Sequence, residues 1–206
     1  MIRLPLVLGA TLLILGSEAG HAQIKVGVTL GMSGATASLG QPALKSIPTL
    51  PKEMSGQKVE YIVLDDESDP SKVGVNARKL ISENNVDVLM GSSSTPTTLP
   101  MIDIAAESKT PLFAVGAGGI LVTPMDDRKR WVFKVIPHDD IMAKAMIKYI
   151  AKTGVKKLAY LGLSDSFGEG YYNVLKDEAP KLGVTLTTHE VYSRSDASVT
   201  GQILKV

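Results

Sequence analysis

Short β-rich runs alternate with amphipathic segments along this chain, at intervals of about 25 to 35 residues, the size of a right-handed βαβ unit. The first four β-rich runs span residues 24–30, 59–64, 87–90 and 112–115. The segments between them carry apolar residues at helical spacing, for example Val73, Ala77 and Leu80. This alternation predicts an α/β fold built on a doubly wound parallel sheet.

Prolines mark where the helices of this pattern begin and break. Asp69 and Pro70 are typical of an N-cap followed by the first helical residue, because proline lacks only an N–H that would have no partner there. The first crossover helix should come from residues 40–54, which contain three prolines. Pro42 suits a first helical position, but Pro48 must kink or break the helix. We therefore expect this helix to be short or distorted.

The pattern changes after the fourth strand, and a second α/β unit begins near residue 138. Residues 131–135, 157–163 and 184–191 are expected strands, and helices are expected to open at residues 137–140 and to span 167–182. Residues 198–206 resemble the start of a further helix. Two parallel strands with one flanking helix cannot enclose a core of their own. Either they complete the first sheet or the chain is a fragment of something longer. We expect a first lobe at 23–137 and an incomplete second lobe at 138–206.

The first 22 residues have the pattern of a secretory signal peptide. Arg3 precedes an apolar run at residues 4–15, and small residues then flank His21. A membrane anchor is the alternative, but this run is well short of the roughly 20 residues needed to span hydrocarbon. We expect cleavage before Gln23, export to the periplasm, and no membrane insertion of the mature chain.

Composition and motifs exclude several classes of function. Lysine and arginine (22) nearly balance aspartate and glutamate (21) without forming a basic cluster, so we expect no nucleic-acid partner. The absence of cysteine excludes disulfides, a thiol nucleophile and thiolate metal sites. No G-x-S-x-G motif of a hydrolase and no P-loop motif of a nucleotide-binding protein occurs. His138 and His189 stand alone, and the paired carboxylates lie at element boundaries, where helix capping explains them. We expect a binding site without catalytic residues, metal or cofactor.

The richest candidate site is the segment 91–98, which follows an expected strand and leads into a helix. It holds six serine or threonine residues, including Ser94, Thr95 and Thr98. Hydroxyl and backbone donors at a helix start suit a carboxylate or another anion. The alternative is a plain N-cap, which needs only one hydroxyl.

Two further loops follow expected strands, where open parallel sheets bind ligands. Gly116 and Gly118 lie in the first, which is not a dinucleotide fingerprint because Leu121 stands where the third glycine is needed. This loop is either a close backbone approach to a ligand or a bare turn. The second loop, residues 165–170, contains Phe167, which is either a pocket wall or a cover over the helix start.

With these residues the chain resembles the type I periplasmic solute-binding proteins of ABC transporters, specifically the branched-chain amino acid (Leu/Ile/Val) binding family. The resemblance implies two Rossmann-like α/β lobes that close over a ligand and then deliver it to a membrane permease. The stretches that carry it are residues 24–28, Ser33, Gly34, Gly40, Asp65, Asp66, Asp69, Pro70, the 91–98 segment, residues 131–133 and residues 167–170.

The resemblance also assigns roles to individual residues. Thr95 matches a hydroxyl that binds the ligand carboxylate, and Thr98 lies one helical turn further on. Gly116 and Gly118 match a loop that holds the carboxylate and the ammonium group of an amino acid. Phe167 matches an aromatic residue of the second lobe.

Two departures from the family pattern concern the ligand. Leu39 stands where amino-acid binders often have tyrosine, and Gly118 stands where a hydroxyl residue is usual. The loop therefore lacks an acceptor for an ammonium group. This favours an acid without an α-amino group, aliphatic or aromatic, over a branched-chain amino acid.

The resemblance implies that the second lobe is truncated in this chain, so we expect weak or absent ligand binding by the chain alone. Three alternatives to a transport binding protein remain open: a periplasmic ligand sensor, a non-functional fragment, and an exported α/β enzyme. The last would need a nucleophile with its base or a phosphate loop, and the sequence shows neither.

Overall fold

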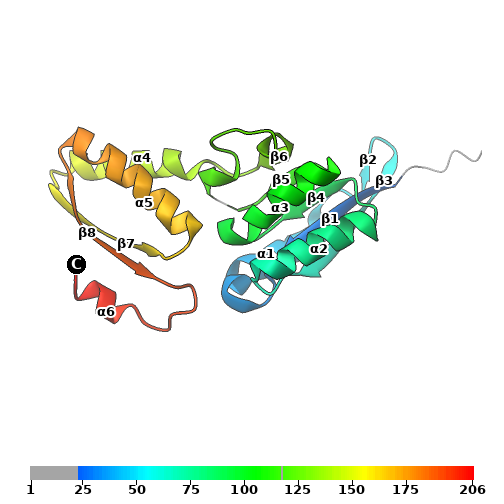
Figure 1. Ribbon diagram of the computed structural model, residues 1–206, viewed down its shortest axis with the longest axis horizontal. Helices are drawn as coiled ribbons and strands as arrows, with labels where there is room; N and C mark the ends of the chain where they lie inside the picture. The colour runs from blue at the N-terminus through cyan, green and yellow to red at the C-terminus, as the bar shows by residue number, and fades with distance from the viewer. Residues whose placement is uncertain (1–22, 117) are drawn as a thin grey trace, which may run out of the picture.

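The computed structural model describes residues 23–116 and 118–206. The predicted signal peptide, residues 1–22, lies outside this described part. Two separate sheets occupy opposite ends of the long axis of the molecule (Figure 1). We call β1–β6 with α1–α3 the N-terminal lobe, and β7, β8 and α4–α6 the C-terminal lobe. Within the described residues, no helix has the length and apolar character needed to cross a membrane.

The N-terminal lobe is built on a six-stranded sheet of order β2-β3-β1-β4-β5-β6. Its strands are β1 (Ile24–Leu30), β2 (Glu53–Met54), β3 (Gln57–Asp65), β4 (Val88–Gly91), β5 (Leu112–Ala114) and β6 (Val132–Lys134). All neighbours are parallel except the short β2–β3 hairpin at one edge. The predicted α/β class and parallel sheet are confirmed, whereas the antiparallel edge strand was not predicted.

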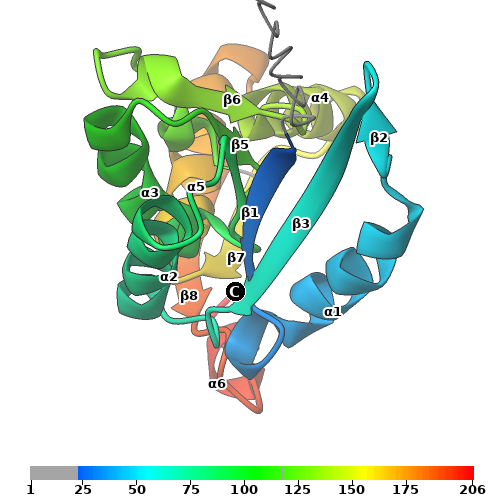
Figure 2. The ribbon, with the colours of Figure 1, turned by 90° about the vertical axis from the view of Figure 1, so that its right-hand side faces the viewer.

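Helices cover both faces of this sheet, as expected of a doubly wound fold. Helix α1 (Ala37–Ser46) lies on one side of β1 and β3, and α2 (Pro70–Ser82) and α3 (Thr95–Ser108) lie on the other (Figure 2). Beneath α2 and α3 the fully buried core includes Leu80, Leu89 and Met101. Val28 belongs to the second core, beneath α1. The apolar periodicity seen in the sequence thus corresponds to real packing.

Proline shapes α1 in one expected and one unexpected way. The helix ends at Ser46 and passes into a 3-10 turn at Ile47–Thr49 that contains Pro48, so the predicted short helix is confirmed. The expectation that Pro42 opens the helix is wrong, because Pro42 lies inside it. The 3-10 turn Gly34–Thr36 has already started the helical path before that residue is reached.

The C-terminal lobe has a two-stranded parallel sheet of its own. Its elements are α4 (Asp139–Lys152), β7 (Lys157–Leu163), α5 (Ser166–Glu178), β8 (Thr185–Tyr192) and α6 (Thr200–Ile203). Ala143, Ile147 and Leu175 form a small buried core beneath α4 and α5. The expectation that this part cannot enclose a core of its own is therefore wrong, because two helices and not one contribute to the core. The alternative in which these strands complete the first sheet is therefore wrong. The expected helix 167–182 is also too long, since Pro180 starts a separate 3-10 turn.

Two adjacent carboxylates tie the strand ends of the N-terminal lobe together. Asp65 accepts hydrogen bonds from the backbone N–H groups of Met32, Ser33 and Glu67 and from the Ser33 hydroxyl. Burial acts to raise the pKa of Asp65, but these hydrogen bonds outweigh it and hold the pKa below its usual 3.8. Asp66 is fully buried, and burial raises its pKa despite hydrogen bonds to the carboxylate.

These opposite shifts predict opposite pH dependences of stability. Near pH 7, Asp65→Asn should lower the free energy of unfolding by about 1 kcal/mol, because an ionised carboxylate accepts stronger hydrogen bonds than an amide oxygen. The gap between wild type and Asp65→Asn should shrink as the pH falls below 3.8, since a group with a lowered native pKa stabilises the fold only while it is ionised. Urea unfolding over a pH series measures the gap.

Asp66→Asn is the matched control. Because the native pKa of Asp66 is raised, the wild-type protein loses stability relative to this variant as the pH rises above 3.8. The two gaps should thus move in opposite directions with pH. If the stability difference from wild type changed in the same direction with pH for both variants, the opposite pKa shifts of Asp65 and Asp66 would be contradicted.

Candidate functional site

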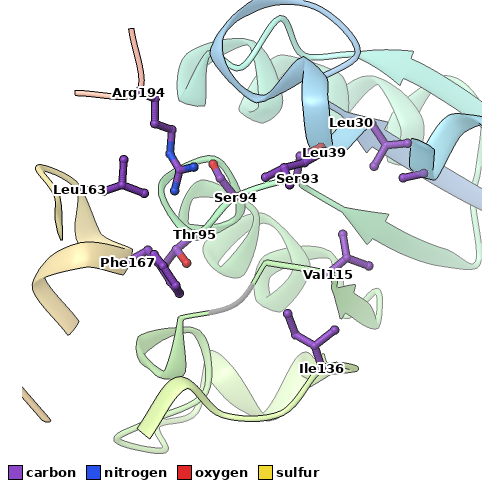
Figure 3. A pocket seen from close by; sticks show the side chains of 11 residues that line it. Leu30, Leu39, Ser93, Ser94, Thr95, Val115, Ile136, Leu163, Phe167 and Arg194 are labelled. Carbon is purple, nitrogen blue, oxygen red and sulfur yellow. The ribbon is translucent and has the colours of Figure 1, made fainter. Parts of the chain in front are cut away.

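A cavity of about 440 Å³ lies between the two lobes, within the size range of small-molecule sites. The strand order β3-β1-β4 reverses at β1, and open α/β sheets bind ligands at the carboxyl ends of the strands beside such a reversal. The cavity lies at that place (Figure 3). It is lined by Leu30, Leu39, Ala43, Ser93, Ser94, Thr95, Val115, Ile136, Leu163, Phe167 and Arg194.

The 91–98 segment divides into hydroxyls that face the cavity and hydroxyls that hold the loop. Ser92 is buried and donates to Asp66 Oδ2 at 2.7 Å. The Thr98 hydroxyl accepts from Ser92 N–H at 3.0 Å and donates to the Ser94 carbonyl at 2.7 Å. Thr97 is turned inward in the same way, onto Ser94. Ser93, Ser94 and Thr95 are the three that line the cavity.

Two of these three keep a hydroxyl hydrogen to offer. Thr95 Oγ1 accepts from the Gly118 N–H at 2.8 Å, and Ser93 Oγ accepts from the Gly31 N–H at 3.0 Å. Among residues 23–116 and 118–206, neither hydroxyl donates to a protein acceptor. Ser94 Oγ instead shares a hydrogen bond with Thr97 Oγ1 at 2.8 Å. Thr95 and Ser93 therefore supply the hydroxyl donors that an anion in the cavity can reach.

Gly116 and Gly118 support this loop from behind and do not line the cavity. A Cβ atom on Gly116 would lie 2.7 Å from Thr98 Oγ1, and one on Gly118 would lie 2.5 Å from Thr95 Cγ2. The loop after β5 thus packs directly on the first turn of α3. Of the predicted site residues, Ser94, Thr95 and Phe167 lie at the cavity, whereas Thr98, Gly116 and Gly118 lie in the layer beneath it.

The C-terminal lobe supplies the opposite wall. Phe167 lies in the first turn of α5 and lines the cavity together with Leu163, at the end of β7. The start of α5 is capped by Asp165, whose Oδ1 accepts from the N–H groups of Phe167 and Gly168. The cap fixes the position of Phe167 at the cavity.

Arg194 is a lining residue that the sequence reasoning missed. It follows the carboxyl end of β8, and its guanidinium reaches into the space beside Ser94 (Figure 3). Its Nε donates to Asp165 Oδ2 at 2.8 Å. The rule that ligands bind at strand ends would have pointed to this residue, because Arg194 lies just beyond an expected strand. Among the described residues that line the cavity, Arg194 is the one with a charged side chain.

A second group of titratable residues lies at the N-terminus of α4. His138, Asp139 and Asp140 bring one potential ligand atom each within 4.8 Å of one another. Asp139 is buried and accepts from the Gly119 N–H at 2.8 Å, which attaches α4 to the loop after β5. The positive end of the helix dipole lies at the same place and disfavours a cation. Asp139 therefore links α4 to the N-terminal lobe.

Comparisons with known proteins agree with this architecture. Residues 23–206 match a family model described as periplasmic binding protein. An extracellular ligand-binding receptor from Rhodopseudomonas palustris HaA2 is 64% identical, with a TM-score of 0.88, over 90% of this chain and 51% of that one. Leu/Ile/Val-binding protein homolog 2 of Brucella abortus is 25% identical over 90% of this chain and 51% of its own length. The fold is also shared by a solute binding protein of an ABC transporter from R. palustris BisB5, whose structure was solved in complex with 3,4-dihydroxy benzoic acid. That protein is 24% identical, with a TM-score of 0.81, over 89% of this chain and 51% of its own.

The chain spans about half the length of the curated relatives it matches. The matched family and these relatives are named as binding proteins, which agrees with the prediction of a binding site. The resemblance inferred from the residues is likewise confirmed.

The tight contact between Gly118 and Thr95 makes a testable prediction. Gly118→Ala should lower the free energy of unfolding by about 1–3 kcal/mol, because the new methyl group must displace a buried threonine. Urea denaturation measures the loss. Gly201→Ala is the control, since nothing lies within 4 Å of its added Cβ, and it should change stability by less than about 1 kcal/mol. Equal stability of the two variants would show that the glycine loop does not support the α3 turn.

Proposed function

The chain belongs to the periplasmic binding protein family, and from this premise we propose that it holds a small carboxylate between its two lobes without transforming it. Its partner would be the membrane permease of an ABC transporter, and its location the periplasm. The observation that carries the proposal is a pair of hydroxyls, on Ser93 and Thr95, that donate to no acceptor within the described residues and lie at the polar end of an otherwise largely apolar cavity. A carboxylate accepts hydrogen bonds and has none to donate, which matches such donors.

The apolar part of the cavity indicates the rest of the ligand. Seven of the lining side chains are apolar, and they come from both lobes: Leu30, Leu39, Ala43, Val115, Ile136, Leu163 and Phe167. Such walls favour a compact hydrocarbon body, whereas the few polar groups fix its orientation. Leu39 is half exposed, so one side of the cavity stays accessible to water and binding by this chain is expected to be weak.

The charges at the cavity favour an acid without an α-amino group. An ammonium group needs an acceptor, and in the part of the chain that the structure describes no aspartate or glutamate lines the cavity. The nearby Asp165 has both oxygens engaged, by the α5 cap and by Arg194. The BisB5 protein, which shares this fold, was solved with 3,4-dihydroxy benzoic acid, an aromatic acid without an amino group. Branched-chain amino acids remain the alternative ligand, supported by the names of the Brucella relatives.

A ligand titration distinguishes these two classes. The chain 23–206 is titrated with benzoate, with 4-methylpentanoate and with leucine, the last two differing only in the α-amino group. Amide chemical shifts in NMR spectra report binding even when it is weak. We expect shifts at Ser93 and Thr95 with the two acids and smaller ones with leucine. Preferential binding of leucine would refute the choice of ligand class, and no binding of any of the three would refute the site.

A further inference from the structure

We propose that Arg194 is the residue that selects an anionic ligand, by binding the carboxylate from the C-terminal lobe while Thr95 binds it from the N-terminal lobe. This inference rests on the proposed function, since it concerns the same cavity. It assigns the charge selectivity of the site to one side chain that lies outside the hydroxyl-rich segment.

The hydrogen bonds of Arg194 leave its terminal nitrogens available. Its Nε donates to Asp165 Oδ2 at 2.8 Å, and in the described part of the chain Nη1 and Nη2 donate to no protein acceptor. An arginine side chain presents its five N–H donors in a planar fork, so fixing Nε orients the other two nitrogens. Figure 3 shows the guanidinium directed toward Ser94, on the hydroxyl side of the cavity.

Asp165 orients this guanidinium rigidly. Its Oδ1 accepts two backbone N–H groups at the start of α5, and its Oδ2 pairs with Arg194. The side chains of Arg194 and Asp165 are only 24% and 19% exposed, so the pair is shielded from water on most sides. The helix cap, which also places Phe167, therefore holds the cation in position before any ligand arrives.

The surroundings of the guanidinium strengthen its effect on an anion. Apart from Arg194, the described residues that line the cavity have apolar or hydroxyl side chains and add no second charge. Hydrogen bonds between a guanidinium and a carboxylate are short and strong, and a partly water-excluded site weakens them less than bulk water does. An uncharged ligand of the same shape gains the apolar contacts but little from Arg194.

The position of Arg194 also couples binding to the arrangement of the lobes. Arg194 follows β8 in the C-terminal lobe, whereas Thr95 begins α3 in the N-terminal lobe. A carboxylate has two oxygens, so one ligand can accept from both residues at once. Any arrangement of the lobes that allows both contacts is favoured when the ligand is bound.

The test compares charged and uncharged ligands of equal shape in the chain 23–206. The probes are benzoate with benzamide and 4-methylpentanoate with 4-methylpentanamide, titrated by NMR. We expect the wild-type chain to bind each acid about tenfold more tightly than its amide. In Arg194→Gln this preference should fall to within about twofold, whereas the affinity for the amides should change little. A purely structural role for Arg194 would weaken acids and amides alike.

Three variants complete the design. Arg128→Gln is the matched control, because it removes the same charge from an exposed arginine that pairs with Asp103 and Asp126 away from the cavity, and it should keep the full preference. Asp165→Asn retains an oxygen to cap α5 but loses the ion pair, and should reduce the preference in part. Arg194→Lys keeps the positive charge without the planar fork of donors, so it should also keep only part of the preference for acids over amides. It serves as the readout if Arg194→Gln does not fold.

The outcomes separate the two proposals. If the wild type binds the acids and Arg194→Gln retains their full preference over the amides, the role of Arg194 is refuted while the proposed function stands. If acids and amides weaken equally in Arg194→Gln, Arg194 has a structural role only and the inference is likewise refuted. If the wild type binds none of the four probes, the proposed function fails and the role of Arg194 fails with it.

Discussion

The buried carboxylate of Asp66 connects the strand ends from which the cavity is built. It accepts from the Thr29 hydroxyl in β1, from Ser92 after β4, and from the backbone N–H of Ser68 after β3. Asn76 in α2 adds a bond to the Thr29 hydroxyl. A buried carboxylate is costly unless donors surround it, so each of these segments is needed to satisfy it. The loop that carries Ser93 and Thr95 is thereby fixed to the centre of the sheet rather than left free at the surface.

This constraint explains why so many hydroxyls occur in one segment. An anion site needs donors at the cavity, but those donors lie on backbone that must itself be held. Ser92 provides the attachment to Asp66, and Thr98 closes the turn by bonding to the backbone of Ser92 and Ser94. The segment therefore combines a capped helix start with hydroxyls that line the cavity, and the anion-binding role of those hydroxyls is part of the proposed function. The capping and cavity-lining roles are divided among residues that the sequence alone does not distinguish.

The parts of the fold that were predicted are those set by local patterns. Buried strands are apolar runs, and Asp69 with Pro70 marks a helix start, so β1, β7 and α2 follow from short-range signals. The β2–β3 hairpin was missed because β2 has only two residues and both are exposed, which leaves no apolar signal. Arg194 was missed although it follows an expected strand, because its partner Asp165 lies 29 residues away and the cavity that it lines forms only where the two lobes meet.

The relation between Arg194 and the missing acidic acceptor bears on which ligand the cavity can hold. An α-amino group lies on the carbon next to the carboxylate, so an amino acid bound through Arg194 would bring its ammonium to within about 5 Å of the guanidinium. At the effective dielectric constant of about 20 typical of such sites, like charges at that distance repel by about 3 kcal/mol. The ammonium would also lose hydration without gaining an acceptor from the lining residues. On the proposed role of Arg194, an acid without the amino group would keep the attraction to the guanidinium and avoid both costs, so the side chain proposed to bind the carboxylate would also disfavour the amino acid.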